Sequence, residues 1–237
     1  MPPCWARRWK AAPPIFARRC FASVAASPFP LPASSSPSYW RPISFLRRSR
    51  IKVFEIRNAT DTAGNKPLRL FYALWPDDVT RDALQALQMQ VHGRRTLPGN
   101  LHATLTFLGN QPATHLPMLE ELLAGLPRNA ITLQIDRIGY FKRKRIAWAG
   151  SHAVPDALIR LQESLAQALT QQEISLDRKN DFTPHITLAR DAEPPTDRPF
   201  EPFTWEVRQI ALVRSMQEGG RLDYRVLASA HLDGDGA

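Results

Sequence analysis

The 237-residue sequence contains only two cysteines, Cys4 and Cys20. The rest of the chain therefore has no thiol for a disulfide, a zinc site or a cysteine nucleophile. The sequence also lacks an uninterrupted apolar run of about 18 residues, which a membrane-spanning helix needs. We accordingly expect no membrane association.

Acidic residues are absent from the first 54 positions, which nevertheless hold ten of the 31 lysines and arginines. The other 183 residues carry 21 basic and 22 acidic side chains, so the formal net charge of +9 originates in the N-terminal segment. The charge balance therefore gives no reason to expect tight RNA binding by the rest of the chain.

Nine prolines interrupt any regular period in this segment, which also contains the Ser-Pro-rich stretch Pro28–Ser38. We predict a basic, disordered extension over residues 1–66, a folded domain over residues 67–232 and a C-terminal tail over residues 233–237. The Arg-rich, acid-free composition is also typical of a transit peptide, and a translation start assigned too far upstream is a further interpretation. We expect a cytoplasmic protein unless the extension acts as a targeting signal.

Beyond Lys66, the hydrophobic pattern predicts an α+β domain. Strands are expected at residues 68–75, 102–109, 131–141, 146–150, 185–190, 203–215 and 222–230. Helices are expected at residues 78–91, 114–126 and 155–171.

The order strand, helix, loop, strand occurs twice in this region. Each second strand begins with His-x-Thr-Leu, at His102 and again at His185. We infer two pseudo-symmetric strand-helix-strand lobes, with largely antiparallel sheets around a central cleft.

Side chains alternate between the two faces of a strand. His102 and Thr104 should therefore share one face, whereas Phe107 should point into the core. His185 and Thr187 should share a face in the same way. If these faces meet, two imidazoles and two hydroxyls converge on one site.

Such a site is suited to metal-free cleavage of a phosphodiester. One neutral imidazole can accept a proton from water, one imidazolium can protonate the leaving oxygen, and the hydroxyls can bind phosphate oxygens. An unperturbed histidine pKa near 6.5 would let both protonation states coexist near neutral pH. A single motif of this kind is usually structural, so the duplication carries the functional interpretation.

Four segments, RLFYALWP, NLHATLTFLGN, FKRKRIAWAG and FTPHITLARDA, resemble the two-histidine (2H) phosphoesterases. Within that superfamily they are similar to the RNA 2′,3′-cyclic phosphodiesterases, also called 2′-5′ RNA ligases. The resemblance covers about residues 68–232 and implies hydrolysis of a terminal RNA 2′,3′-cyclic phosphate to a 2′-phosphomonoester. It further implies that His102 donates a proton to the 3′ oxygen, that His185 activates water, and that Thr104 and Thr187 hold the phosphate.

Two other functions stay open. ATP-independent joining of RNA ends through a 2′-5′ linkage would use the same residues. A non-catalytic RNA-binding module would be expected to lose a motif histidine, and both are present. No H-E-x-x-H, paired-carboxylate or Gly-rich phosphate motif appears, so we expect no metal, no cofactor and a monomer that binds RNA ends.

Two basic features have alternative interpretations. Strand parity places Arg190 on the face away from His185. If the strand bends there, Arg190 faces the site, and its charge would help neutralise a cyclic phosphate. The tip Lys142–Arg145 either grips an RNA backbone beside a base-stacking Trp148, or is a charged hairpin end with Trp148 in the core.

Overall fold

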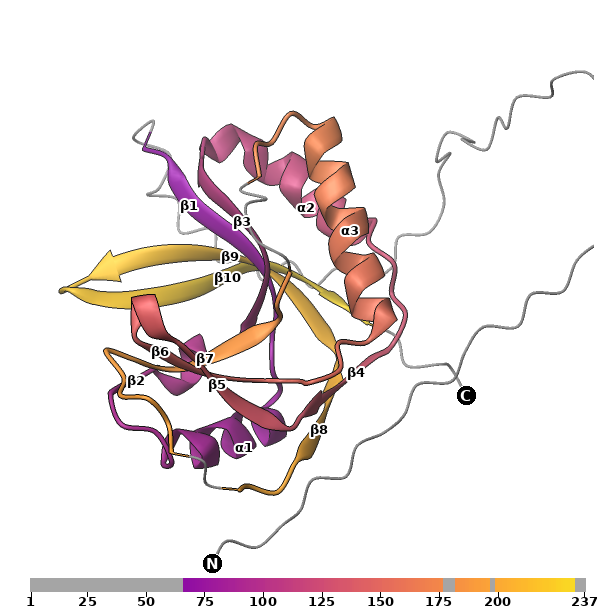
Figure 1. The fold of residues 1–237 in the computed structure, drawn as a ribbon. Coiled ribbons are helices and arrows are strands. Elements are labelled where there is room, and N and C mark those ends of the chain that lie inside the picture. Colours follow the sequence, from indigo (N-terminus) through magenta and orange to yellow (C-terminus); the bar gives the residue numbers. More distant parts are fainter. Residues whose placement is uncertain (1–65, 177–181, 197–198, 233–237) are drawn as a thin grey trace, which may run out of the picture. The chain divides into compact units, whose positions relative to one another are not determined.

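The computed structural model describes residues 66–176, 182–196 and 199–232, shown as the coloured ribbon in Figure 1. The predicted extension, apart from Lys66, and the predicted C-terminal tail lie outside the described residues. Within the described ranges, no helix is long and apolar enough to cross a membrane.

The secondary structure is mixed, as predicted. The strands are β1 (Leu68–Leu74), β2 (Arg94–Arg95), β3 (Ala103–Gln111), β4 (Ile131–Ile135), β5 (Arg137–Phe141), β6 (Ile146–Gly150), β7 (His185–Arg190), β8 (Phe203–Val207), β9 (Gln209–Glu218) and β10 (Arg221–His231). The helices are α1 (Asp78–Gln88), α2 (Leu116–Ala124) and α3 (Asp156–Gln171), with short 3-10 turns η1 (Pro98–Asn100), η2 (Ala113–His115) and η3 (Lys142–Lys144).

Eight strands form one sheet in the order β10-β9-β1-β3-β7-β6-β5, and β2 pairs with β7. The pairings in this sheet are antiparallel. The motif-bearing strands β3 and β7 are neighbours that meet at a single pair, Ala103 and Ile186. The chain therefore places its two His-x-Thr-Leu segments next to each other at the centre of the sheet.

The internal repeat is visible in this strand order. The units β1-α1-β3 and β6-α3-β7 occupy mirrored positions, with β3 and β7 innermost. The helices cross between the units, because α1 packs against β7 and α3 packs against β3. Figure 1 shows α1 on the side of β6 and β7, whereas α2 and α3 lie together beside β3. Each unit hence supports the motif-bearing strand of the other.

Two strands that we predicted as continuous are each divided. The run 131–141 breaks at Asp136 into β4 and β5, and the run 203–215 breaks at Arg208 into β8 and β9. The cause is a change of partner: β4 and β8 pair with each other in a separate ladder, whereas β5 and β9 belong to the main sheet. At the first break, the Asp136 carboxylate accepts a hydrogen bond from the His152 backbone N–H at 2.8 Å.

One continuous hydrophobic core lies beneath the face of the sheet opposite the motif histidines. It joins Leu70 and Leu74 of β1 to residues from all three helices and to Trp205 of β8. A smaller cluster on the other face contains Phe71, Ala73, Ala211 and Val213. The sheet thus has a large buried face and a second, smaller apolar patch, and the candidate site is built next to that patch.

Candidate active site

The two motif histidines lie at equivalent positions on adjacent strands. His102 immediately precedes β3, and His185 is the first residue of β7. Both imidazoles are half-buried. They are close enough that a positive charge on His185 lowers the pKa of His102. The predicted convergence of the two histidines is therefore present in the structure.

Both imidazoles make the same hydrogen bond. Nδ1 of His102 lies 2.7 Å from the carbonyl oxygen of Asn100, and Nδ1 of His185 lies 2.8 Å from that of Thr183. A carbonyl oxygen only accepts hydrogen bonds, so Nδ1 carries the proton in each neutral ring. Nε2 is then the nitrogen that takes up or releases a proton. The duplicated motif thus presents two Nε2 atoms as acid and base.

The turn before His102 is anchored to a distant strand. Asn100 is buried, and its side-chain amide donates to the carbonyl oxygen of Leu222 on β10 at 2.9 Å. Because the carbonyl of the same residue receives His102 Nδ1, this anchor also orients the His102 ring. The Asn-Leu-His segment therefore holds the His102 ring in a fixed orientation.

Aromatic rings surround His102. The ring centroids of Phe71, Tyr224 and Trp75 lie 4.9, 5.0 and 5.8 Å from its own. Burial lowers the pKa of His102 to about 4, with smaller contributions from the charges of His185 and Arg190, while the bond to Asn100 opposes the shift. Our assumption of an unperturbed pKa near 6.5 is wrong for this group, because the rings exclude water from the imidazolium.

His185 has a different neighbourhood. Phe141 meets it edge-on at 4.9 Å, and Trp148 lies at 6.1 Å. Burial again lowers the pKa, and the positive charges of Lys144 and Arg190 lower it further against the bond to Thr183. The pKa of each histidine is therefore below its ordinary value in the free protein.

The two motif threonines follow the predicted alternation. Thr104 and Thr187 are half-buried like the histidines, whereas the intervening Ala103 and Ile186 are buried. Thr104 pairs with Ala73, a member of the smaller apolar cluster on the site's face. The hydroxyls are consequently on the strand face that carries the imidazoles.

Arg190 belongs to the site, although regular strand parity would turn it away. Ala189 pairs with Ala147 while Thr187 pairs with the adjacent Trp148, so Leu188 is an extra residue opposite β6. This β-bulge changes the parity of the strand beyond it. The Arg190 charge accordingly lowers the pKa of both motif histidines and opposes the burial that raises the pKa of Tyr224.

Phe107 lies at the site and not in the core, contrary to our prediction. Tyr72 pairs with Thr106 and Ala73 with Thr104, so Leu105 is an extra residue in β3 and changes the parity. Phe107 then shares the face of Thr104, where its ring lies 5.8 Å from that of Phe71. It is 60% exposed, a large apolar surface next to the His102 cluster.

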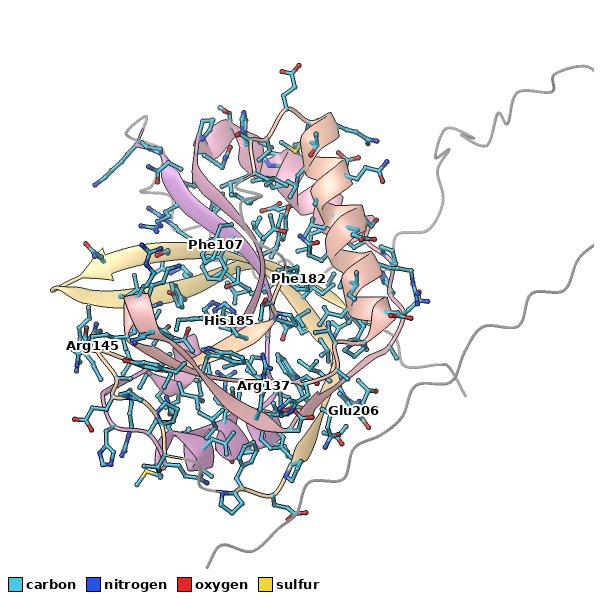
Figure 2. The ribbon with its side chains drawn as sticks, viewed as in Figure 1. Phe107, Arg137, Arg145, Phe182, His185 and Glu206 are labelled. Atoms are coloured by element: carbon cyan, nitrogen blue, oxygen red, sulfur yellow. The ribbon has the colours of Figure 1, made fainter. Side chains whose placement is uncertain are left out.

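Trp148 and the tip Lys142–Arg145 lie in different environments. Trp148 is 5% exposed and lies across Gly139, where an added Cβ would be 2.1 Å from the indole. Trp148 is therefore buried, as the second interpretation expected, but it lies on the face of Thr187 and His185 and not in the main core. The tip Lys142–Arg145 is exposed, and Figure 2 shows Arg145 and Phe107 on different sides of His185.

Sequence reasoning missed Phe71, Trp75 and Tyr224. They come from β1, from the residue after it, and from β10, and no motif marks them. Their aromatic character was visible, but only the strand order reveals that β1 and β10 flank the same site.

In the part of the chain that the structure describes, no three His, Cys, Asp or Glu side chains gather as potential metal ligands. A hollow of about 440 Å³ lies elsewhere, between Asp136–Ile138 and a segment that includes Pro195 and Phe200. None of its lining residues is a motif residue, so we place the site at the histidines on geometric grounds.

Comparison with known proteins agrees with this geometry. The sequence profile of the 2′-5′ RNA ligase superfamily matches residues 75–218. The RNA 2′,3′-cyclic phosphodiesterase of Escherichia coli K12 is 32% identical over 170 residues, which cover 69% of this chain and 96% of the relative. The protein of the same name from Thermus thermophilus is 32% identical over 185 residues, covering 71% and 92%.

Among solved structures, that of E. coli LigT complexed with 3′-AMP has a TM-score of 0.60 at 29% identity. It covers 70% of this chain and 98% of LigT. The repeated motif, the paired histidines and these likenesses together show that the chain belongs to the 2′-5′ RNA ligase superfamily of 2H phosphoesterases.

Proposed function

We propose that the domain hydrolyses the 2′,3′-cyclic phosphate at an RNA 3′ end to a 2′-phosphomonoester, without a metal ion. The observation that carries this proposal is the matched pair of Nδ1 hydrogen bonds, which leaves one Nε2 on each histidine for proton transfer. The relatives from E. coli and T. thermophilus, both named RNA 2′,3′-cyclic phosphodiesterase, support the same reaction.

The reaction divides acid and base work between the histidines. His185 Nε2 accepts a proton from water while the water oxygen forms a bond to phosphorus. The bond between phosphorus and O3′ breaks, and His102 Nε2 gives its proton to O3′. The bond to O2′ remains, so the product is a 2′-phosphomonoester. Each proton transfer of this type contributes about 10²–10⁴-fold to the rate.

The remaining site residues would bind the phosphate. Arg190 lies within electrostatic reach of both histidines and can neutralise the negative charge on the phosphate oxygens. The Thr104 and Thr187 hydroxyls can donate to the same oxygens. A bound anion next to Arg190 would also raise the pKa of His102, which favours the imidazolium that the acid role requires.

The surroundings of the histidines support His102 as the proton donor. The exposed ring of Phe107, which packs against the buried ring of Phe71, offers a surface on which the terminal nucleoside can stack. The ribose, with its O3′, would then lie near His102. The attacking and leaving oxygens of a phosphoryl transfer are roughly in line, so water would approach from the side of His185.

The direct test is incubation of the protein in EDTA with an RNA ending in a 2′,3′-cyclic phosphate. The expected product is the 2′-phosphomonoester, formed as fast with chelator as without it, and lost in the double variant His102→Ala/His185→Ala. A 3′-phosphate product would overturn the leaving-group assignment. Activity that EDTA removes and one divalent ion restores would overturn the metal-free mechanism.

A further inference from the structure

The two sides of the site carry different chemistry. The His102 side is aromatic, with Phe71, Trp75, Phe107 and Tyr224 within one ring-contact cluster. The His185 side continues directly into a run of four positive charges, because Phe141, which contacts His185, is followed by the tip Lys142–Arg145. A nucleoside suits the first surface, and an RNA phosphodiester backbone suits the second.

The tip is a defined turn, fixed to the strand that carries His185. The Arg145 N–H donates to the Lys142 carbonyl at 3.3 Å, and Arg145 has a left-handed backbone with φ of 49°. The Arg145 carbonyl in turn accepts a hydrogen bond of 2.8 Å from Ala192, two residues after β7. The position of the four cations relative to His185 is therefore set by backbone bonds.

The tip charges are exposed and available to a ligand. Lys142, Arg143, Lys144 and Arg145 are all exposed. Among the ion pairs of the described residues, none includes a tip side chain. The Lys144 charge also lowers the pKa of His185, which shows how near the tip is to the base.

We infer that the tip binds the backbone of a second RNA, whose 5′-hydroxyl takes the place of water. This inference rests on the proposed function. The terminal nucleoside and O3′ occupy the His102 side, so an in-line nucleophile, and any chain attached to it, lies on the His185 side. We therefore expect the strand that carries the cyclic phosphate to leave by the His102 side, away from the tip.

The corresponding reaction is balanced without ATP. The 5′ oxygen forms a bond to phosphorus as its proton passes to His185, and the bond to O3′ breaks as His102 protonates O3′. The O2′ bond is kept, so the product is a 2′-5′ phosphodiester. Hydrolysis and joining then differ only in whether water or the tip-bound strand reaches phosphorus first.

The test measures both products in one reaction of the full chain with two RNAs, a donor ending in a 2′,3′-cyclic phosphate and a subsaturating acceptor with a 5′-hydroxyl. The readout is the ratio of 2′-5′ joined product to 2′-phosphate product. Removing one phosphate contact weakens single-strand binding about fivefold at about 0.1 M salt, because the salt slope is about 0.7 per contact. Arg143→Ala should lower the ratio about fivefold, and Lys142→Ala/Arg143→Ala about 25-fold.

Three comparisons make the result specific. Arg143→Lys should restore the ratio, because it restores the charge. Arg160→Ala removes an exposed cation from α3 and should leave the ratio unchanged. The logarithm of the ratio should depend less steeply on the logarithm of salt concentration, by about 0.7 for each tip cation removed. Lys144 is left in place because its charge acts on His185.

Each outcome decides the inference. If joining and hydrolysis fall together in Arg143→Ala, the tip holds the donor strand, and the inference is overturned. A ratio that stays unchanged in Arg143→Ala would also overturn the inference. A wild-type protein that hydrolyses but never joins would overturn the second-strand site and leave the hydrolase standing. A wild-type protein that forms neither product would overturn the proposed function itself.

Discussion

His102 and His185 share a motif and a hydrogen-bond pattern, but their neighbours give them different chemical surroundings. The rings of Phe71 on β1, Trp75 and Tyr224 on β10 surround His102, whereas His185 lies near the cations of η3. In the free protein the pKa of both is below 6.5, and the two charges repel each other. They consequently titrate as a coupled pair, whose two apparent pKa values belong to the pair.

The rate should have a bell-shaped pH dependence whose maximum for kcat/KM lies below pH 6.5, because one imidazole must be protonated and both pKa values are lowered. Arg190→Gln should move both limbs to higher pH, since it removes a positive charge that lowers both values. It should also reduce kcat/KM through loss of a phosphate contact. Steady-state kinetics from about pH 4 to pH 9 would check this. Unmoved limbs in Arg190→Gln would contradict the placement of Arg190 at the histidines.

Burial of neutral His102 should make the protein less stable in acid. The folded-state pKa of about 4 lies below the unfolded value of 6.5, so the unfolded state binds more protons between these values. The free energy of unfolding should therefore fall, by up to about 3 kcal/mol, as the pH decreases from 6.5 to about 4. Urea titrations would measure it. The free energy of unfolding of His102→Gln should fall less over this pH range. An equal fall would refute the assignment of this pH dependence to His102.

At the scale of elements, the two bulges decide which side chains enter the site. Leu105 in β3 brings Phe107 to it, and Leu188 in β7 brings Arg190. The Leu188 carbonyl accepts hydrogen bonds from the Gln88 side chain at 2.8 Å and from the Thr96 N–H at 2.9 Å. Gln88, which is 4% exposed at the end of α1, also donates to the Thr96 carbonyl. One helix residue thus supports the bulge in the neighbouring unit.

Gln88→Leu should destabilise the protein by about 1–3 kcal/mol, because the Thr96 carbonyl loses its side-chain donor and the Leu188 carbonyl keeps only the Thr96 N–H. It should also raise KM more than it lowers kcat, since a relaxed bulge misplaces the phosphate-binding Arg190. Urea unfolding and steady-state kinetics would measure the two effects. Gln85→Leu is the matched control on the same helix, because Gln85 donates to the side chain of the exposed Asp82. Equal effects of both substitutions would argue against support of the bulge by Gln88.

The bulges also explain what the sequence could and could not predict. The hydrophobic period predicted most strands and helices within a few residues, and the repeat predicted that His102, Thr104, His185 and Thr187 share a face. The sequence could not predict that Phe107 and Arg190 lie at the site. A bulge leaves no pattern in a single sequence, and it reverses the alternation of side chains beyond it. The divided strands at Asp136 and Arg208 were missed because apolar alternation does not reveal a change of pairing partner.

At the scale of the whole molecule, the crossed packing of α1 and α3 joins the two repeats, so the domain we predicted over residues 67–232 should fold as one unit. The N-terminal segment contributes the excess positive charge and no motif residue. Its effects should therefore be separable from catalysis.

Removal of residues 1–60 should leave the urea midpoint and kcat/KM unchanged, because neither motif lies there. It should weaken salt-sensitive, sequence-independent RNA binding and reduce its salt dependence, since the ten basic residues of the first 54 positions are removed while the tip Lys142–Arg145 stays. Filter binding at low and high salt would measure this. A truncated protein that is insoluble or inactive would show that the segment belongs to the domain.

The most direct test of divided acid and base work is a leaving-group comparison. With ordinary cyclic-phosphate RNA, His102→Ala and His185→Ala should each lower kcat by about 10²–10⁴-fold. The control His92→Ala changes an exposed histidine outside both motifs and should leave kcat unchanged. Replacement of O3′ by sulfur creates a leaving group that needs no protonation. His102→Ala should then recover most of its lost rate and His185→Ala should not, because water must still be activated. Recovery by His185→Ala alone would reverse the two roles, and equal recovery by both variants, or by neither, would contradict the division of labour between the two histidines.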